Sequence, residues 1–240
     1  FTMNTSKKKI LLISPDFPPP LVGGSLVWLL NLLTNCPEDF DILTGPKDDS
    51  FQEIFQDSKR KRIYRSMFIK DSHDPSKFQL LLMYFYMPLW MVIKNFKENY
   101  SAVLVNPGAV GNSILFLVGK IFNIKVIGVG HGEEITVPLY GKGLKNFIKR
   151  LIIKFSYKYA SGFIVVCHFC KRLLNDLNVK NEMIDVIPSC LNPNKFKNNH
   201  SAIKQKFKII SVGRLIERKG FHFLIDAVNL LKEEIPEIKL

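Results

Sequence analysis

The residues best suited to chemistry lie near the end of the 240-residue sequence, where two cations stand between two glycines. Arg214 and Lys219 follow Gly213 and precede Gly220. The apolar run at residues 209–212 predicts a strand before this loop, and a helix is expected after it. In open α/β sheets, ligands bind outside the carboxyl ends of strands, where helix N-termini also point. The loop is therefore suited to binding a diphosphate through charge-assisted hydrogen bonds.

A second group of polar residues follows the strand predicted at residues 125–129. His131 is flanked by glycines, and Glu133 and Glu134 come next. A neighbouring carboxylate can hold the tautomer of a histidine or raise its pKa. A lone histidine is usually a packing or surface residue, but this position favours His131 as a functional-site residue, with the two glutamates as candidate substrate-binding residues.

Gly23 and Gly24 follow a predicted strand at residues 9–14 and precede a helical run at residues 26–33, with Ser25 as the expected N-cap. Glycines at a helix N-terminus let backbone N–H groups approach an anion closely. The spacing is not that of the G-x-G-x-x-G dinucleotide motif. The pair therefore predicts either an anion or sugar site, or simply a tight turn.

The four cysteines are too few to indicate a disulfide framework in a chain of this length. Cys167 and Cys170 have the spacing of metal ligands, but no second Cys/His pair follows at the distance of a zinc finger. We expect no metal and no cofactor.

The net charge is +13, with an isoelectric point near 9.5. This charge favours anionic partners, such as phosphorylated small molecules, nucleic acid or anionic lipid. The cations cluster at residues 59–65 and 142–158, and we interpret residues 59–62 as a solvated loop. Since no helix-turn-helix, RNP or zinc pattern accompanies them, we expect no specific nucleic-acid binding.

Residues 143–159 predict an amphipathic helix. Its cations fall mostly away from its apolar positions and include Lys145, Lys149, Arg150 and Lys154. This pattern fits a core-facing helix with a basic outer face, or a helix that docks on an anionic membrane surface.

The longest apolar run, residues 78–93, is shorter than the roughly 20 residues of a membrane-spanning helix, and predicts a buried or interfacial one. Without a recognisable signal peptide, the chain is expected in the cytoplasm, with peripheral contact to the inner face of the membrane left open.

Alternating strands and helices predict an α/β protein with a parallel, doubly wound sheet covered by helices on both faces. We expect one domain over residues 1–200 and the first β-α unit of a second domain over residues 201–240, joined by a linker at residues 192–206. The expected strands are residues 9–14, 40–44, 102–105, 125–129, 162–166, 184–187 and 209–212.

Together these motifs resemble the family 4 glycosyltransferases of the GT-B fold, over nearly the whole chain. The most specific match is residues 212–220, and residues 10–24, 131–132, 163–166 and 186–196 add to it. The resemblance implies two Rossmann-like domains across a cleft, the first for a glycan or lipid-linked acceptor and the second for a nucleotide-sugar donor. It also implies transfer with retention of anomeric configuration and without a metal.

The same resemblance implies a role for each matching residue. Gly23 and Gly24 would present N–H groups to the donor phosphates, and His131 would contact the transferred sugar. Arg214 and Lys219 would bind the donor diphosphate and stabilise charge on the leaving group, which is transition-state electrostatics.

Two departures from the family pattern stand out. Cys190 occupies a position where the family often has glycine, and the family's paired glutamates would lie beyond Leu240. We therefore expect a truncated second Rossmann-like domain and a fragment inactive by itself. A nicotinamide oxidoreductase is disfavoured because no G-x-G-x-x-G follows a leading strand. A basic Rossmann-type module that binds membrane or nucleic acid without catalysis remains the alternative.

Overall fold

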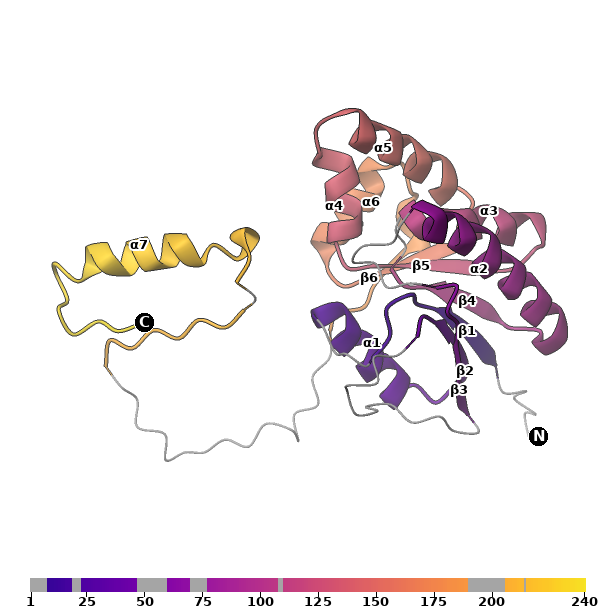
Figure 1. Cartoon of the computed structure of the whole chain (residues 1–240), viewed down its shortest axis with the longest axis horizontal. Coiled ribbons are helices and arrows are strands. Elements are labelled where there is room, and N and C mark those ends of the chain that lie inside the picture. Colours follow the sequence, from indigo (N-terminus) through magenta and orange to yellow (C-terminus); the bar gives the residue numbers. More distant parts are fainter. Residues whose placement is uncertain are drawn as a thin grey trace. The chain divides into compact units, whose positions relative to one another are not determined.

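The computed structural model describes residues 8–18, 23–46, 60–69, 77–107, 110–189, 206–213 and 215–240. The chain forms two compact units, Phe1–Leu191 and Asn192–Leu240 (Figure 1). The domain boundary predicted at residue 200 lies outside the described residues, as does all of the predicted linker except residue 206.

The first unit is built on one seven-stranded sheet in the order β3-β2-β1-β4-β5-β6-β7, and every neighbouring pair is parallel. This confirms the predicted α/β, Rossmann-like fold. The strands are β1 (Lys9–Ile13), β2 (Asp39–Thr44), β3 (Lys61–Arg65), β4 (Ala102–Val105), β5 (Val126–Gly130), β6 (Gly162–Val165) and β7 (Ile184–Val186).

Helices cover both faces of this sheet, because successive residues of its central strands are apolar and point to opposite faces. Leu12 packs into a core with α1 (Gly24–Asn35), and Leu11 packs into the larger core on the other face. The helices that contribute to this larger core are α2 (Lys77–Glu98), α3 (Ser113–Ile121), α4 (Glu133–Tyr140), α5 (Leu144–Tyr157) and α6 (His168–Asp176).

Residues 61–65 form the edge strand β3, so the interpretation of residues 59–62 as a solvated loop was wrong for Lys61 and Arg62. The reason is a buried partner on β2, which the sequence does not identify. Arg62 Nε lies 2.9 Å from Asp41 Oδ1, and the Asp41 side chain is fully buried. The ion pair therefore holds the basic segment in the sheet.

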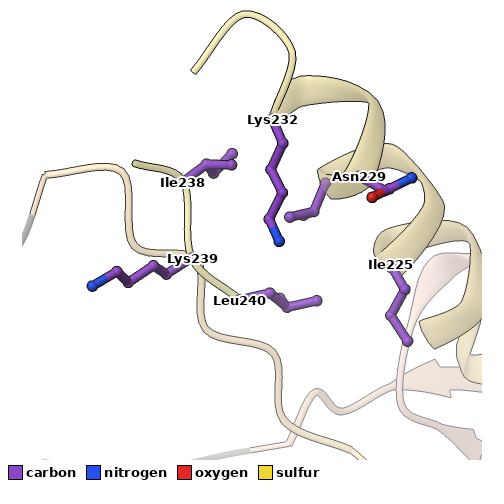
Figure 2. A pocket seen from close by; sticks show the side chains of 7 residues that line it. Ile225, Asn229, Lys232, Ile238, Lys239 and Leu240 are labelled. Atoms are coloured by element: carbon purple, nitrogen blue, oxygen red, sulfur yellow. The ribbon is translucent and has the colours of Figure 1, made fainter. Parts of the chain in front are cut away.

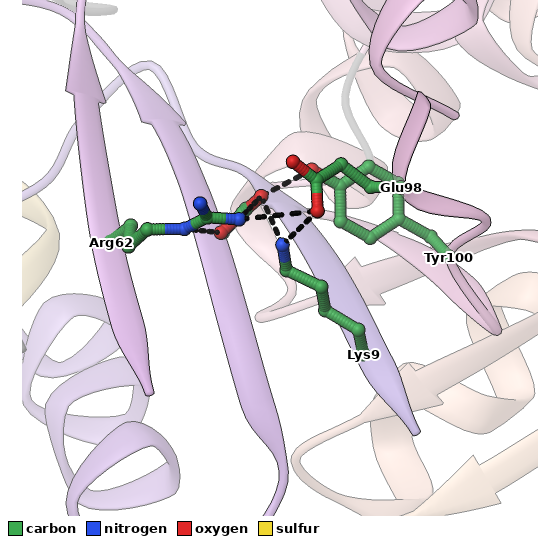
Figure 3. A network of polar contacts seen from close by, with 5 residues as sticks. Lys9, Arg62, Glu98 and Tyr100 are labelled. Atoms are coloured by element: carbon green, nitrogen blue, oxygen red, sulfur yellow. Dashed lines mark hydrogen bonds and ion pairs between the residues drawn. The ribbon is translucent and has the colours of Figure 1, made fainter. Parts of the chain in front are cut away.

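Asp41 is the centre of a polar network that joins β1, β2 and β3 to the end of α2 (Figure 3). Lys9 Nζ lies 3.0 Å from Asp41 Oδ2 and 2.5 Å from Glu98 Oε2, and the Tyr100 hydroxyl donates to Asp41 Oδ2. Burial alone would raise the pKa of Asp41, but hydrogen bonds from Tyr100, Arg62 and Lys9 outweigh it and lower the pKa. The carboxylate is thus charged and fully paired.

The second unit contains the helix α7 (Phe221–Leu231), which begins directly after Gly220 as predicted. The strand predicted at residues 209–212 is not formed in the described part of this unit. Its segment makes only a parallel bridge between Lys208 and Lys239, with Ile209 N donating to Lys239 O at 2.8 Å. A single bridge does not make a sheet, because each strand of a sheet needs a row of paired backbone groups.

Candidate functional site

The carboxyl ends of three adjacent strands bring a polar cluster together in the first unit. Ser14 follows β1, Asn106 follows β4 and His131 follows β5, and these strands lie side by side in the order β1-β4-β5. Parallel neighbours end at the same edge of a sheet, which is where open α/β sheets bind their ligands. His131 therefore stands where the sequence predicted it.

The ring of His131 is held by two neighbours. Its Nε2 lies 2.7 Å from Asn106 Oδ1, and the edge of the Trp28 ring from α1 contacts it with ring centroids 5.4 Å apart. Burial lowers the pKa of His131 to about 4, so the imidazole is neutral near pH 7. This corrects the expectation that a neighbouring carboxylate raises its pKa or holds its tautomer, because the ring's partner is an amide.

The two glutamates after His131 begin the helix α4, which the sequence reading did not foresee. Glu134 Oε1 accepts hydrogen bonds from the backbone N–H groups of His131 and Gly132, the latter at 3.1 Å. Burial raises the pKa of Glu134 more than these bonds lower it. Glu134 therefore fixes the backbone at the helix start, while Glu133 lies on the exposed side of α4.

Gly132 requires its glycine because its φ is 120°, a region that residues with side chains rarely adopt. A Cβ at this position would lie 3.4 Å from the buried Cys170 Sγ, so α6 also closes on this turn. The turn places His131 at the sheet edge and starts α4 directly after it.

Gly23 and Gly24 stand at the N-terminus of α1. Gly23 is the N-cap, with a φ of 89°, which corrects the prediction of Ser25 in that role. Both glycines are exposed, and a Cβ on either would meet no atom within 4 Å. Trp28, one turn further along α1, contacts His131. The N–H groups of the first turn of α1, which have no carbonyl partner within the helix, thus belong to the same end of the sheet as His131.

The predicted phosphate-binding cations lie in the second unit. Arg214 is outside the described residues. Lys219 is exposed at the end of a short 3-10 turn, Glu217–Lys219, just before Gly220 and α7. The site prediction for this pair remains a prediction.

One hollow of the second unit lies between α7 and the last residues of the chain (Figure 2). Its volume is about 410 Å³, and neither Lys219 nor any other predicted site residue lines it. The lining residues are Ile225, Val228, Asn229, Lys232, Ile238, Lys239 and Leu240.

Cys167 and Cys170 lie close together at the start of α6, with their Sγ atoms 3.4 Å apart. A hydrogen bond from the Cys170 backbone N–H lowers the pKa of Cys167, whereas burial raises the pKa of Cys170 to about 12. Within the described ranges, no group of three or more His, Cys, Asp or Glu side chains is arranged to hold a metal ion.

Most of the apolar residues of α5 do not face the core, so of the two alternatives left open for this helix, a core-facing helix with a basic outer face was wrong. Ile153 and Tyr157 are the large side chains it buries. Six large apolar side chains on α5 are instead between 41% and 74% exposed. They are Leu144, Phe147, Ile148, Leu151, Ile152 and Phe155.

The four cations proposed to face a membrane differ in their surroundings. Lys145 and Lys154 are exposed, while Lys149 and Arg150 are half-buried. The Nε of Arg150 is enclosed and has no hydrogen-bond partner among the described residues. Lys145 and Lys154 are therefore the two available to an external surface.

Sequence reasoning missed Ser14 and Asn106, the residues behind His131. Ser14 is the polar last residue of the strand predicted at residues 9–14, and Asn106 directly follows the strand predicted at residues 102–105, and those positions were the available signal. Their contact could not be foreseen because it depends on β1, β4 and β5 being neighbours in the sheet.

No family model matches the sequence. The chain is 26% identical over 216 residues to an uncharacterized glycosyltransferase of Methanocaldococcus jannaschii, a match that covers 84% of this chain and 52% of the relative. The chain thus spans about half the length of this curated relative.

Solved structures share the fold. The structure of the Anabaena protein HepE in complex with UDP and glucose matches with a TM-score of 0.62 and 16% identity, over 92% of this chain and 57% of that one. The Arabidopsis thaliana protein UGT89C1, complexed with UDP-L-rhamnose, matches with a TM-score of 0.55 and 12% identity, over 78% and 53% of the two chains. The first unit is therefore a Rossmann-like domain of the GT-B type.

Proposed function

We propose that this chain is the acceptor-side part of a glycosyltransferase, which moves a sugar from a nucleotide-sugar donor to a glycan or lipid-linked acceptor. The observation that carries the proposal is the neutral, largely buried His131 at the carboxyl edge of a GT-B-type sheet, beside the open N-terminus of α1. The similarity to a glycosyltransferase, and to proteins solved with UDP and glucose or with UDP-L-rhamnose, supports the same activity.

Each site residue has a role in this proposal. His131 contacts the transferred sugar, and the N–H groups at Gly23 and Gly24 bind the donor phosphates. Arg214 and Lys219 bind the diphosphate and stabilise the negative charge that develops on the leaving group. Glu133 contacts substrate, while Glu134 orients the backbone of His131 through its hydrogen bonds.

We also propose transfer with retention and without a metal ion, as in the family that the motifs resemble. The test uses the full-length natural protein, a panel of UDP-, GDP- and ADP-sugars, and a lipid and glycan acceptor extract. We expect one donor to yield nucleoside diphosphate and glycosylated product, with the anomeric configuration preserved by NMR and with activity unchanged by EDTA. Failure of every donor to give product would overturn the proposed activity; an inverted product or an EDTA-sensitive reaction would overturn its details.

A second part of the proposal is that the first unit docks on an anionic membrane surface. The six exposed apolar side chains of α5 form a stripe. A similar stripe lies on α2, where six apolar side chains recur every three or four residues and are between 46% and 75% exposed. They are Phe78, Leu81, Phe85, Leu89, Ile93 and Phe96. On the opposite side of α2, Met83, Met87 and Met91 fill the core.

The charges of this face favour anionic lipid as the occupant. The helix α3 contacts both α2 and α5, so the three helices form one continuous layer (Figure 1). Their sequences carry cations and a single acid, Glu98, which is engaged by Lys9 and Arg62. Apolar side chains combined with unopposed cations are what an anionic lipid surface binds. In the part of the chain described, none of the helices has the length and apolar character to cross a bilayer.

A further inference from the structure

The cluster behind His131 contains a directional chain of hydrogen bonds. The Ser14 hydroxyl lies 2.5 Å from the Asp16 carbonyl oxygen, and a hydroxyl has one hydrogen, which it donates there. Ser14 Oγ is then left as an acceptor for Asn106 Nδ2, at 3.1 Å. Ser14 and Asn106 are both almost fully buried, so water does not compete for these bonds. The amide of Asn106 is thereby fixed, with its nitrogen toward Ser14 and its oxygen toward His131.

This orientation determines the proton on the histidine ring. Asn106 Oδ1 can only accept, so His131 Nε2, at 2.7 Å, must donate. The bond made by one ring nitrogen sets the tautomer of a neutral imidazole, so the other nitrogen, Nδ1, carries a lone pair. No described residue bonds Nδ1.

We infer that Asn106, held by Ser14, is a positioning residue that fixes His131 as its Nε2–H tautomer, so that Nδ1 accepts a hydrogen bond from a hydroxyl of the donor sugar. The ligand in this inference rests on the proposed function. The tautomer is a property of the free chain and can be measured without substrate.

The sharpest perturbation is Asn106→Asp, which keeps the size of the side chain and adds a charge. The carboxylate still accepts from Nε2, but its negative charge favours the doubly protonated ring and raises the pKa of His131 by about 1–3 units. Nδ1 then becomes a donor in mildly acidic solution. Among the described residues, the titratable groups beside this turn include Glu133 and Glu134 on α4 and Cys170 on α6, and the variant changes none of them. Trp28, the contact from α1, carries no charge.

The experiment is two-bond ¹H–¹⁵N NMR of the histidine rings in the 240-residue chain, which distinguishes the two neutral tautomers from the charged ring. The signal of His131 is assigned by its loss in His131→Gln. We expect the wild-type ring to be protonated at Nε2 alone near pH 7, and its titration to shift upward by at least one unit in Asn106→Asp.

Asn112→Asp is the matched control. Asn112 is also almost fully buried, but its Nδ2 donates to the Pro107 carbonyl oxygen at 2.7 Å, so the variant should leave the titration of His131 near its wild-type position. If Asn106→Asp does not fold, Ser14→Ala serves instead, because it frees the amide to flip and should produce a mixture of tautomers. A wild-type ring protonated at Nδ1, a titration that Asn106→Asp leaves unchanged, or, where Ser14→Ala is used, a ring still protonated at Nε2 alone would overturn the inference.

Transfer by the full-length protein separates this inference from the proposed function. Absence of transfer in the wild type overturns the proposed function and the sugar ligand, whatever the tautomer. If transfer occurs with the same pH profile in the wild type and in Asn106→Asp, then Nδ1 does not accept from the sugar. An acid limb that moves upward by about the shift seen by NMR supports the whole inference.

Discussion

At the scale of the residue, burial decides how two side chains of this protein behave. His131 loses water without gaining a charged partner for its ring, so its neutral form is favoured. Asp41 is fully buried as well, but it gains Lys9, Arg62 and Tyr100, so its charged form is favoured. The first is left able to bind a ligand, and the second is committed to holding the sheet together.

The Asp41 network gives a prediction about stability. Asp41→Asn removes the charge that Arg62 and Lys9 neutralise, and should lower the free energy of unfolding at pH 7 by about 3 kcal/mol, since breaking a buried pair is costly. Asp39→Asn, which breaks the more exposed pair with Arg60, should cost less than about 1 kcal/mol. The measurement is urea unfolding followed by circular dichroism.

The pH dependence of this cost has a definite sign. The folded pKa of Asp41 lies below its ordinary value of 3.8, so its contribution is present above that value and is lost as the pH falls through the folded pKa. The difference between wild type and Asp41→Asn should therefore shrink in strong acid. Equal costs for Asp41→Asn and Asp39→Asn at pH 7 would contradict the account.

At the scale of the element, the sequence predicted which segments form helices, but not which face of each helix is buried. The spacing of apolar residues predicted a helix over residues 143–159, and α5 (Leu144–Tyr157) is that helix. Which stripe faces the core depends on how the helix packs on the sheet, and only Ile153, Ser156 and Tyr157 are buried. Similarly, the sequence does not show which stripe of α2 is exposed, because this depends on its methionines packing into the core.

The exposed stripes predict binding to lipid vesicles. The 240-residue chain should co-sediment with vesicles containing phosphatidylglycerol and less with pure phosphatidylcholine, and added salt should weaken the binding. Phe85→Glu on α2 and Leu151→Glu on α5 should each reduce the affinity about tenfold or more, because an inserted apolar side chain contributes roughly 1.5–3 kcal/mol. Val27→Glu, an exposed position on α1, is the control and should have little effect. If Phe85→Glu and Leu151→Glu bind the vesicles as tightly as Val27→Glu and the wild type, this face is excluded as the docking surface.

At the scale of the whole molecule, the sequence predicted the first unit far better than the second. Long apolar strands separated by helical runs specify a parallel sheet, so six of its seven strands were found near their observed positions. The exception, β3, has no apolar run and is held by Asp41 from a neighbouring strand. In the second unit, residues 209–212 have the composition of a strand but find only the single bridge from Lys208 to Lys239.

Within the candidate site of the first unit, the residues could be recognised but their contacts could not. His131, Gly23 and Gly24 could be recognised because each lies directly beside the end of a strand or the start of a helix. Asn106 and Ser14 also lie at strand ends, but their contacts with each other and with His131 could not be predicted, because these contacts follow from the order of strands in the sheet. The combined picture is a GT-B-type domain whose sheet edge carries a neutral histidine.

The most direct test of the central claim is the effect of His131→Ala on sugar transfer by the full-length protein. His168→Ala, which removes an exposed histidine at the start of α6, is the matched control. We predict that kcat falls by about 10²-fold or more in His131→Ala, the order of loss seen when a group that acts on the transition state is removed, and that His168→Ala stays close to wild type. Transfer that survives His131→Ala at the rate of His168→Ala would contradict the claim that this edge of the sheet is the active site.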